Sequence, residues 1–296
     1  MTESSLTATL LANGPYARAD APFELVDVNG PDAGPFLHRL CSQDVLGLAE
    51  GEVAPAAFLN AKGKVQLTVL VWPTDEGFRL ETQRVQADAL VESLQRYHFS
   101  EQLTITRVEA AGCHELVAAA TDPLRRADTT SSGCRVAFAR RGVQFVRSYG
   151  DASTAEAAPL PDDLAEALRM AAGLVRIGVE TERTTVALEA DLDDHCSAKK
   201  GCYTGQEVIA RLRTYGGVNR KLCLLRMDAG DAIDAPTTLL ELEDEIPVGR
   251  VLHAISVSGH DGRVGLGYLP RDFQALGTEL KLEDGGAVEV VGFADA

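Results

Sequence analysis

The sequence of 296 residues has no hydrophobic run long enough to cross a bilayer. Its most apolar stretch, Leu67 to Trp72, contains Thr68 and is far shorter than the roughly 20 residues that a membrane-spanning helix needs. The first residues, MTESSLTATLLANG, contain no Lys or Arg before a short apolar stretch, which fits neither a secretory signal nor a transit peptide. These absences predict no membrane partner and a cytoplasmic location.

Closely spaced cysteines are also missing. None of the six cysteines forms a CxxC pair, and their wide spacing is unlike a secreted disulfide scaffold. We expect thiols in a reducing compartment, with no structural zinc site and no iron–sulfur ligand set. The sequence also contains no GxxxxGK[ST] motif, so nothing supports nucleoside triphosphate hydrolysis.

Positive charge is scarce. Lys and Arg number 28 against 44 Asp and Glu, giving a net charge of −16 and a pI of about 4.8. Such a balance opposes non-specific binding to DNA, RNA or anionic lipid. The segment from Lys199 to Arg226 reverses the sign, because it holds seven basic residues and only one acid, Glu207. This segment is either a solvated basic helix face or a local site for an anionic ligand.

What is present is an ordinary globular composition, 45% hydrophobic and 24% charged, with enough residues for more than one core. Apolar residues at three- and four-residue spacing predict four helices: Pro31–Cys41, Val85–Tyr97, Pro161–Leu174 and Thr204–Tyr215. Short alternating or β-branched runs predict strands from Ala54 to Arg147 between these helices. After Arg220 the helical signal ends, and about six short runs separated by Gly and Asp predict an antiparallel β-barrel.

Polar, Pro-containing or Gly-containing stretches mark the expected domain boundaries. They lie at Asp122–Gly133, Gly150–Pro161 and Gly230–Pro236. We therefore divide the chain into an N-terminal α/β part (1–125), a second α/β part (126–220) and a barrel (221–296). The fold class that follows is α+β.

The segment Lys200-Gly201-Cys202-Tyr203-Thr204-Gly205-Gln206-Glu207 holds the most informative chemistry. Thr204 and Glu207 have the spacing of a capping box, which predicts that a helix begins there. Cys202 is then placed just before a helix N-terminus and close to two lysines, and both features favour a thiolate. The alternative is a small, buried, unreactive side chain. Tyr203 likewise either offers a flat face to a heterocycle or packs in the core.

This segment resembles the signature of the YgfZ-type folate-binding proteins, relatives of the glycine-cleavage T-protein, an aminomethyltransferase. Other parts of the chain match the same family in order. They are Asn29–Val45, the turn Asn60-Ala61-Lys62-Gly63-Lys64, the run Leu168–Gly173, and Gly265–Leu269. The resemblance covers nearly the whole chain.

The resemblance implies a ring-like, multi-domain fold with a C-terminal β-barrel, and tetrahydrofolate or a one-carbon derivative in the central opening. Family members assist the maturation or repair of iron–sulfur proteins, including enzymes that modify tRNA, so iron–sulfur client enzymes are the implied partners. The family's functionally sensitive cysteine matches Cys202, to which we give the catalytic role. The implied folate-binding residues are Lys200, Tyr203, Gln206, Glu207, Arg211, Asn60 and Lys62. The basic segment agrees with a glutamate or polyglutamate tail on the folate.

Two departures from the T-protein pattern argue against glycine cleavage. The catalytic acids of the T-protein have no counterpart in the run Gly63–Leu67, so a general acid or base is missing there. The T-protein stretch R-x-E-A-G, whose Glu recognises the pterin, has Ala171 at that position. Glu207 is the acid that we expect to replace it.

Three hypotheses remain. The first is a monomeric folate-binding accessory protein for iron–sulfur enzymes that uses Cys202 as a reactive thiol. The second is a folate-dependent aminomethyltransferase or methyltransferase, and the third is a protein-binding scaffold with a vestigial folate pocket.

Overall fold

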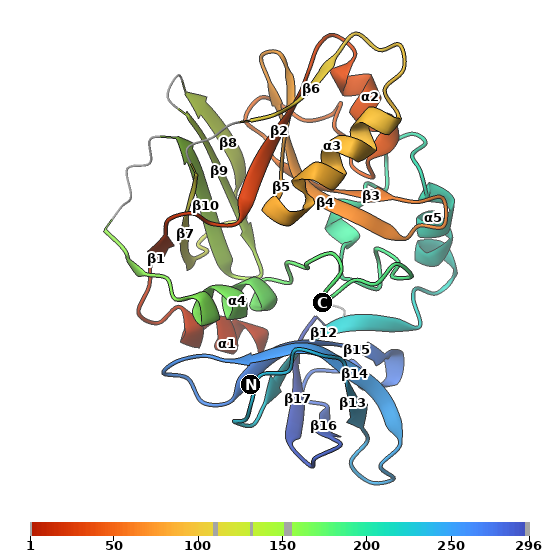
Figure 1. The fold of residues 1–296 in the computed structure, drawn as a ribbon. Coiled ribbons are helices and arrows are strands. Elements are labelled where there is room, and N and C mark those ends of the chain that lie inside the picture. Colours follow the sequence, from red (N-terminus) through yellow and green to blue (C-terminus); the bar gives the residue numbers. More distant parts are fainter. Residues whose placement is uncertain (1, 109–111, 131–132, 151–155, 294–296) are drawn as a thin grey trace.

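The computed structural model describes residues 2–108, 112–130, 133–150 and 156–293. Two β-sheets pack against each other above a C-terminal barrel, and two of the helices lie between these sheets and the barrel (Figure 1). The described helices are α1 (Glu3–Leu10), α2 (Ala33–Leu40), α3 (Ala87–Arg96), α4 (Asp162–Ala171) and α5 (Gln206–Tyr215). The mixed α+β class expected from the sequence is confirmed.

The first sheet is antiparallel and has the strand order β3-β4-β5-β2-β6. Its strands are β2 (Phe23–Asn29), β3 (Ala54–Leu59), β4 (Val65–Thr74), β5 (Gly77–Gln83) and β6 (Thr104–Arg107). Helices α2 and α3 cover one face, where Phe36, Leu37, Leu90 and Leu94 are buried against the strands. The turn Asn60–Lys64 joins β3 to β4, as the sequence predicts.

The second sheet has the order β11-β1-β7-β10-β9-β8 and covers the other face of the first sheet. Its strands are β1 (Tyr16–Arg18), β7 (Cys113–Ala119), β8 (Arg125–Thr130), β9 (Gly133–Arg140), β10 (Val143–Gly150) and β11 (Ala158–Pro159). Leu25 and Trp72 of the first sheet meet Cys113, Val136 and Tyr149 of the second in a buried cluster. The facing of the two sheets places inward-pointing side chains of β5, β7 and β10 close together.

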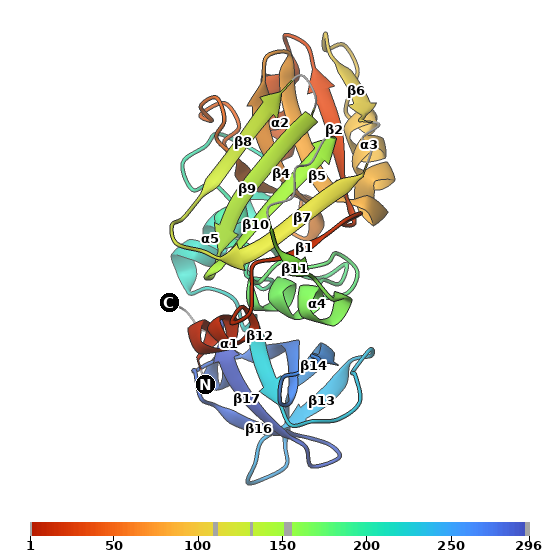
Figure 2. The ribbon, with the colours of Figure 1, turned by 90° about the vertical axis from the view of Figure 1, so that its left-hand side faces the viewer.

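The barrel is closed and antiparallel, with the order β12-β15-β14-β13-β16-β17. Its strands are β12 (Arg220–Met227), β13 (Thr237–Leu240), β14 (Pro247–Ser256), β15 (Arg263–Pro270), β16 (Glu279–Leu282) and β17 (Ala287–Gly292). The predicted C-terminal barrel is therefore confirmed. Helices α1 and α4 lie between the barrel and the second sheet (Figure 2).

Some local predictions are wrong. The predicted break Asp122–Gly133 contains β8, which forms the edge of the second sheet, and α1, β1 and β2 were not predicted from the sequence. Part of the predicted break Gly150–Pro161 lies outside the described residues. The division of the α/β region at residue 125 stays a prediction, and the second sheet takes strands from both sides of it.

The capping box at α5 is also wrong. The helix begins at Gln206 after Gly205, which has a left-handed backbone (φ 84°), and no side chain caps its N-terminus. A Cβ atom on Gly205 would lie 2.6 Å from the carbonyl oxygen of Asn60 and 3.0 Å from Cα of Gly63. The contact with the Asn60–Lys64 turn therefore decides the helix start, because only glycine fits this space and this φ.

Candidate functional site

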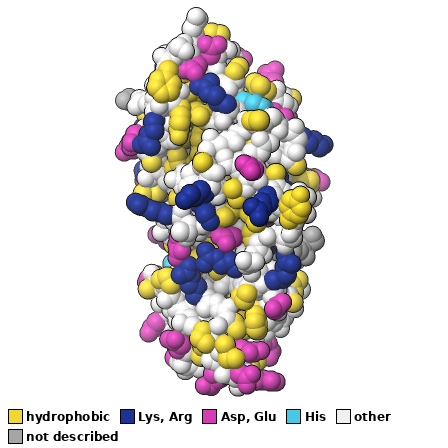
Figure 3. Space-filling model, turned by 90° about the vertical axis from the view of Figure 1, so that its right-hand side faces the viewer, with side chains coloured by type: hydrophobic (Ala, Val, Ile, Leu, Met, Phe, Trp, Pro, Cys, Tyr) yellow, Lys and Arg dark blue, Asp and Glu magenta, His cyan; other side chains and the backbone are white. Residues whose placement is uncertain are grey.

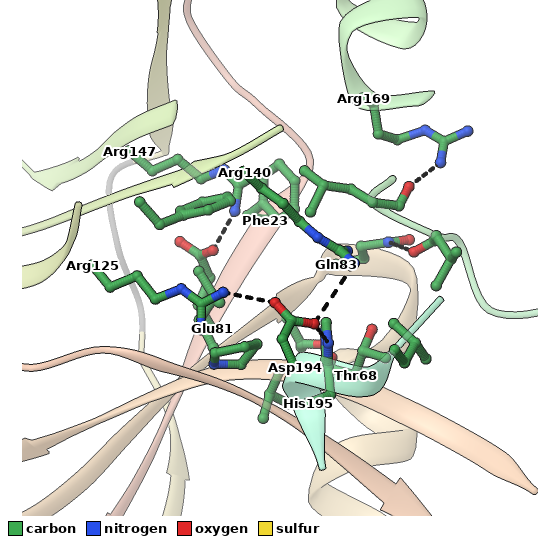
Figure 4. Close-up of a pocket in the computed structure, with 18 residues that line it drawn as sticks. Phe23, Thr68, Glu81, Gln83, Arg125, Arg140, Arg147, Arg169, Asp194 and His195 are labelled. Atoms are coloured by element: carbon green, nitrogen blue, oxygen red, sulfur yellow. Dashed lines mark hydrogen bonds and ion pairs between the residues drawn. The ribbon is translucent and has the colours of Figure 1, made fainter. Parts of the chain in front are cut away.

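A pocket lies at the junction of the two sheets and the chain that follows α4 (Figure 4). Its cavity volume is about 90 Å³, and its mouth is open to solvent. Its apolar wall comes from five separate segments of the chain: Phe23, Leu70, Phe138, Leu174, Val175 and Leu192. Four arginines, two acids and a histidine supply most of its charged and polar surface: Arg125, Arg140, Arg147, Arg169, Glu81, Asp194 and His195.

One group of charges surrounds Asp194, in the short helix η2 (Asp193–His195). Arg125, Arg140 and His195 point toward this carboxylate (Figure 4). The Arg125 Nη2 atom lies 2.6 Å from Oδ2, the His195 Nδ1 atom 2.8 Å from Oδ1, and the Arg140 Nη2 atom 3.6 Å from Oδ1. Burial opposes ionisation, but the hydrogen bond of His195 and the nearby arginine charges hold the pKa of Asp194 well below its usual range.

A second group is fully buried between the sheets. Arg147 on β10 forms an ion pair with Glu81 on β5, and its Nε atom donates to Glu115 on β7 at 2.8 Å. The Tyr149 hydroxyl donates to the other oxygen of Glu81 at 2.7 Å. Because burial and the Glu81 charge raise the pKa of Tyr149 well above its ordinary value, this phenol stays protonated. The Arg147 guanidinium also lies 3.3 Å from the centre of the Phe23 ring.

Arg169 on α4 closes the pocket on the barrel side. Its Nη2 atom lies 2.7 Å from Glu180 and 2.7 Å from Glu166, and its Nη1 atom donates to the carbonyl of Leu174. Ala171, at the position of the T-protein pterin-binding Glu, is fully buried. The T-protein position thus carries no acid, and the acids that line this pocket are Glu81 and Asp194.

The signature segment lies outside the pocket, at the loop that leads into α5. Lys200 is buried, and its Nζ atom donates to the carbonyl oxygens of His38, Cys41 (2.8 Å) and Gln43 (2.9 Å) at the end of α2. Burial lowers the pKa of Lys200. Tyr203 is packed in the core beside this ammonium group, and burial raises its pKa to about 12. These two side chains anchor the loop.

Between these two anchors, Cys202 is exposed, while the other five cysteines are buried. The alternative of a buried cysteine at this position is therefore wrong. Gln206 reaches the carbonyl of Lys200 at 3.5 Å, whereas Glu207 and Arg211 lie exposed on α5. The turn that carries Asn60 and Lys62 packs against Gly205 and Val208 of the same segment.

The structure thus brings the Asn60–Lys64 turn and the signature segment together. None of the predicted site residues lines the pocket at the junction of the two sheets, which we call the central pocket. The charged residues that do line it were not predicted from the sequence. A signal for two buried members of their network was present: Glu115 and Arg147 occupy the inward phase of alternating strands, between buried apolar residues. No such signal marks Arg125 or Asp194, whose positions depend on the packing of distant segments.

Within the described residues, no helix is long and apolar enough to cross a membrane. The same part of the chain contains no cluster of three or more His, Cys, Asp or Glu side chains that could hold a metal ion.

The fold is that of the glycine-cleavage aminomethyltransferases. The crystal structure of aminomethyltransferase T from Bartonella henselae matches with a TM-score of 0.72 over 97% of this chain and 88% of that chain, at 19% sequence identity. No family model matches the sequence.

Curated relatives define the family more closely. A mitochondrial iron–sulfur cluster assembly factor IBA57 homolog of Phaeosphaeria nodorum is 30% identical over 78% of this chain and 59% of its own length. The tRNA-modifying protein YgfZ of Vibrio vulnificus is 26% identical over 84% of this chain and 82% of its own length. A chloroplastic protein of Arabidopsis thaliana is 25% identical over 87% of this chain, which spans 66% of that protein. The chain is thus similar, at 25–30% identity over most of its length, to members of the YgfZ/IBA57 family, which is related to the glycine-cleavage T-protein.

Proposed function

We propose that this protein is a tetrahydrofolate-binding accessory protein for the assembly or repair of iron–sulfur clusters, including clusters of tRNA-modifying enzymes. The family supports the process, because one relative is named as an iron–sulfur cluster assembly factor and another as a tRNA-modifying protein. The central pocket is the observation that carries the folate part of the proposal. A cytoplasmic location and a monomeric state stay predictions from the sequence.

The pocket suits a ligand with one flat apolar part and one anionic part. Phe23, Leu70 and Phe138 offer apolar surface to a pteridine and its aromatic linker. Arg125 is the most accessible arginine of the Asp194 group, 37% exposed, and is placed to meet a glutamate carboxylate. When bound, tetrahydrofolate supplies a carrier for one-carbon groups, and the residues of this chain hold and orient it.

The charges in the pocket favour an accessory role over aminomethyl transfer. A general base works best when its pKa lies near the operating pH. Asp194 is instead held ionised by Arg125, Arg140 and His195. Glu81 is shared between Arg147 and Tyr149. Both carboxylates are thus committed to neighbours of the chain, which leaves them poorly suited to remove a proton from a folate nitrogen.

The thiol of Cys202 has a task separate from folate binding in this proposal. It is exposed and does not line the pocket. The short segment that follows His195 connects the pocket to Cys202. In this segment, the Ser197 N–H donates to the carbonyl oxygen of Ser42 at 2.9 Å, and Lys200 anchors the chain to the end of α2. We infer that Cys202 acts on the client protein.

Calorimetric titration of tetrahydrofolate and its polyglutamate tests where folate binds. Arg125 and Arg126 are neighbours on β8, but Arg125 reaches the pocket whereas Arg126 pairs with exposed Asp128 at 3.0 Å. Arg125→Ala should weaken binding by about tenfold, the loss of roughly one charge-assisted hydrogen bond. The matched variant Arg126→Ala should bind as the wild type does.

Two further variants separate the alternatives. Cys202→Ala should keep folate affinity, and so should Glu207→Ala if the central pocket is the site. A loss confined to Glu207→Ala would move the folate site to the signature segment. Absence of binding to the wild type would overturn the folate proposal and favour the scaffold hypothesis.

The iron–sulfur role needs a cellular readout. In cells that lack this protein, activities of iron–sulfur enzymes should fall, while enzymes without clusters keep theirs. Wild-type chain should restore these activities and Cys202→Ala should not. Full rescue by Cys202→Ala would contradict the role given to the thiol.

A further inference from the structure

The surface around Cys202 carries cations that form no ion pair within the described residues. Lys62, Lys199 and Arg211 are exposed and Lys64 is half-buried, and none of the four forms an ion pair within the described residues. We call Cys202 and these four cations the Cys202 face. Lys and Arg side chains gather across the middle of this side of the molecule, whereas Asp and Glu dominate its barrel end (Figure 3).

Packing of the Asn60–Lys64 turn on α5 and the anchored loop before the helix hold the members of this face together. Gly63, which separates Lys62 from Lys64, packs closely against Val208 on α5, since a Cβ atom added to this glycine would lie only 3.1 Å from the valine side chain. Arg211 follows Val208 by nearly one helical turn and therefore lies on the same side of α5. Lys199 and Cys202 precede the helix on the loop that Lys200 and Tyr203 anchor.

We propose that the Cys202 face docks an acidic surface of a partner protein. Cations without partners keep their full attraction for an incoming carboxylate, whereas cations already paired do not. Tyr215, which is 84% exposed at the end of α5, adds an aromatic side chain of the kind that anchors protein interfaces. The proposal adds the partner's chemistry to the role inferred for Cys202, and it does not depend on folate binding.

Charge favours a protein over a nucleic acid as the partner. Nucleic-acid binding relies on neutralising many phosphates along an extended surface, about 6–10 for a typical specific site. The Cys202 face has four cations without an ion pair in the described residues, the exposed acid Glu207 lies one turn before Arg211 on α5, and the chain as a whole carries a net charge of −16. On the same side of the molecule, Asp and Glu side chains lie at the barrel end (Figure 3). A compact acidic patch fits this arrangement, whereas a long polyanion meets repulsion beyond it.

The exposed thiol allows a direct test with defined probes. Acidic, neutral and basic peptides of equal length each carry one cysteine activated as a pyridyl disulfide, and a single-stranded RNA of equal length carries the same group. The Cys202 thiolate attacks the probe's sulfur, a new disulfide forms, and pyridinethiolate leaves, so no oxidant is needed. The release of pyridinethione gives the rate. Cys202→Ser provides the background rate.

At low salt the acidic peptide should react about tenfold faster than the neutral one, and the basic peptide more slowly. High salt should remove the difference because it screens exposed charges. The double variant Lys62→Glu/Arg211→Glu should reverse the order of the peptides. Arg135→Glu is the matched control, since Arg135 is an exposed cation on β9 without an ion pair in the described chain, and it should leave the order unchanged.

Two results would overturn the proposal. One is an order of peptide rates that the double variant does not change. The other is a faster reaction of the RNA than of the acidic peptide, which would assign this face to nucleic acid. Because no folate is present in this assay, its failure is distinct from failure of the calorimetric titration.

Discussion

The central pocket and the Cys202 face use charge in opposite ways. In the pocket, Arg147, Glu81 and Asp194 are each bound to a neighbour of opposite charge, and most of these contacts are buried. On the Cys202 face, Lys62 and Arg211 have no such neighbour in the described chain. Paired charges fix the geometry of the two sheets and of the pocket between them. Unpaired charges leave their attraction available to another molecule.

The largest expected effect concerns Arg147. Its replacement by Leu leaves Glu81 and Glu115 buried without their shared cation, and loss of one partner of a buried ion pair typically costs about 3–5 kcal/mol. Urea unfolding measures this loss. Arg126→Leu, which removes an exposed pair, should change stability by less than about 1 kcal/mol. Equal effects of the two changes would show that the buried network does not hold the sheets together.

The second-largest loss of stability is expected at Lys200, because its ammonium group anchors the loop that carries Cys202. Lys200→Met removes an ammonium group that satisfies three backbone carbonyls, with an expected destabilisation of about 2–4 kcal/mol. Lys199→Met, at an exposed neighbour, should stay within about 0.5 kcal/mol. Thermal unfolding of both variants gives the comparison, and a stable Lys200→Met protein would mean that the loop is held by other contacts.

Gly205→Ala tests how the signature segment meets the Asn60–Lys64 turn. The new methyl group meets backbone atoms and the residue keeps a left-handed φ, so we expect a loss of about 2 kcal/mol. At Gly201, a Cβ atom has open space around it. Gly201→Ala should therefore be nearly neutral in the same unfolding experiment, and similar losses at both glycines would argue against close packing of Gly205 on the turn.

The pH dependence of stability reports on Asp194. Because its pKa is depressed in the folded state, its stabilisation is complete above the unfolded value of about 3.9 and is lost as the pH falls below it. Asp194→Asn should lower stability by about 1–2 kcal/mol at pH 7, and the gap to wild type should close below about pH 4. Denaturant unfolding across this range measures the gap. A gap that stays constant with pH would contradict the ionised state of Asp194.

The smallest effect on stability is expected at Cys202 itself. Cys202→Ser changes an exposed side chain and should shift stability by less than about 0.5 kcal/mol. It should nevertheless abolish the fast phase when an aromatic disulfide titrates the native thiols. Burial raises the pKa of Cys113 to about 12 and that of Cys196 to about 11, so these thiols should react only after unfolding. A second fast thiol in the native protein would contradict this assignment.

Much of the fold is predictable because its signals are local. Alternation in β10 and β7, the apolar spacing in α3 and α4, and the Gly-separated barrel strands all follow from neighbouring residues. Two of the elements that were missed, β1 and β8, depend on distant partners. Strand β1 has only three residues and exists by pairing with β7 and β11, and β8 is a polar edge strand that pairs with β9.

The candidate sites show the same difference between features set by neighbouring residues and features set by distant segments. The sequence by itself determined that a signature with one cysteine, one lysine and two glycines exists, and that it lies in the one strongly basic segment of an acidic chain. Only the tertiary structure decided that Lys200 anchors the loop while Cys202 is exposed, and that Glu81, Arg125 and Asp194 meet in one pocket. The physical reason is that burial and ion pairing depend on which segments pack together, and these segments are far apart along the chain.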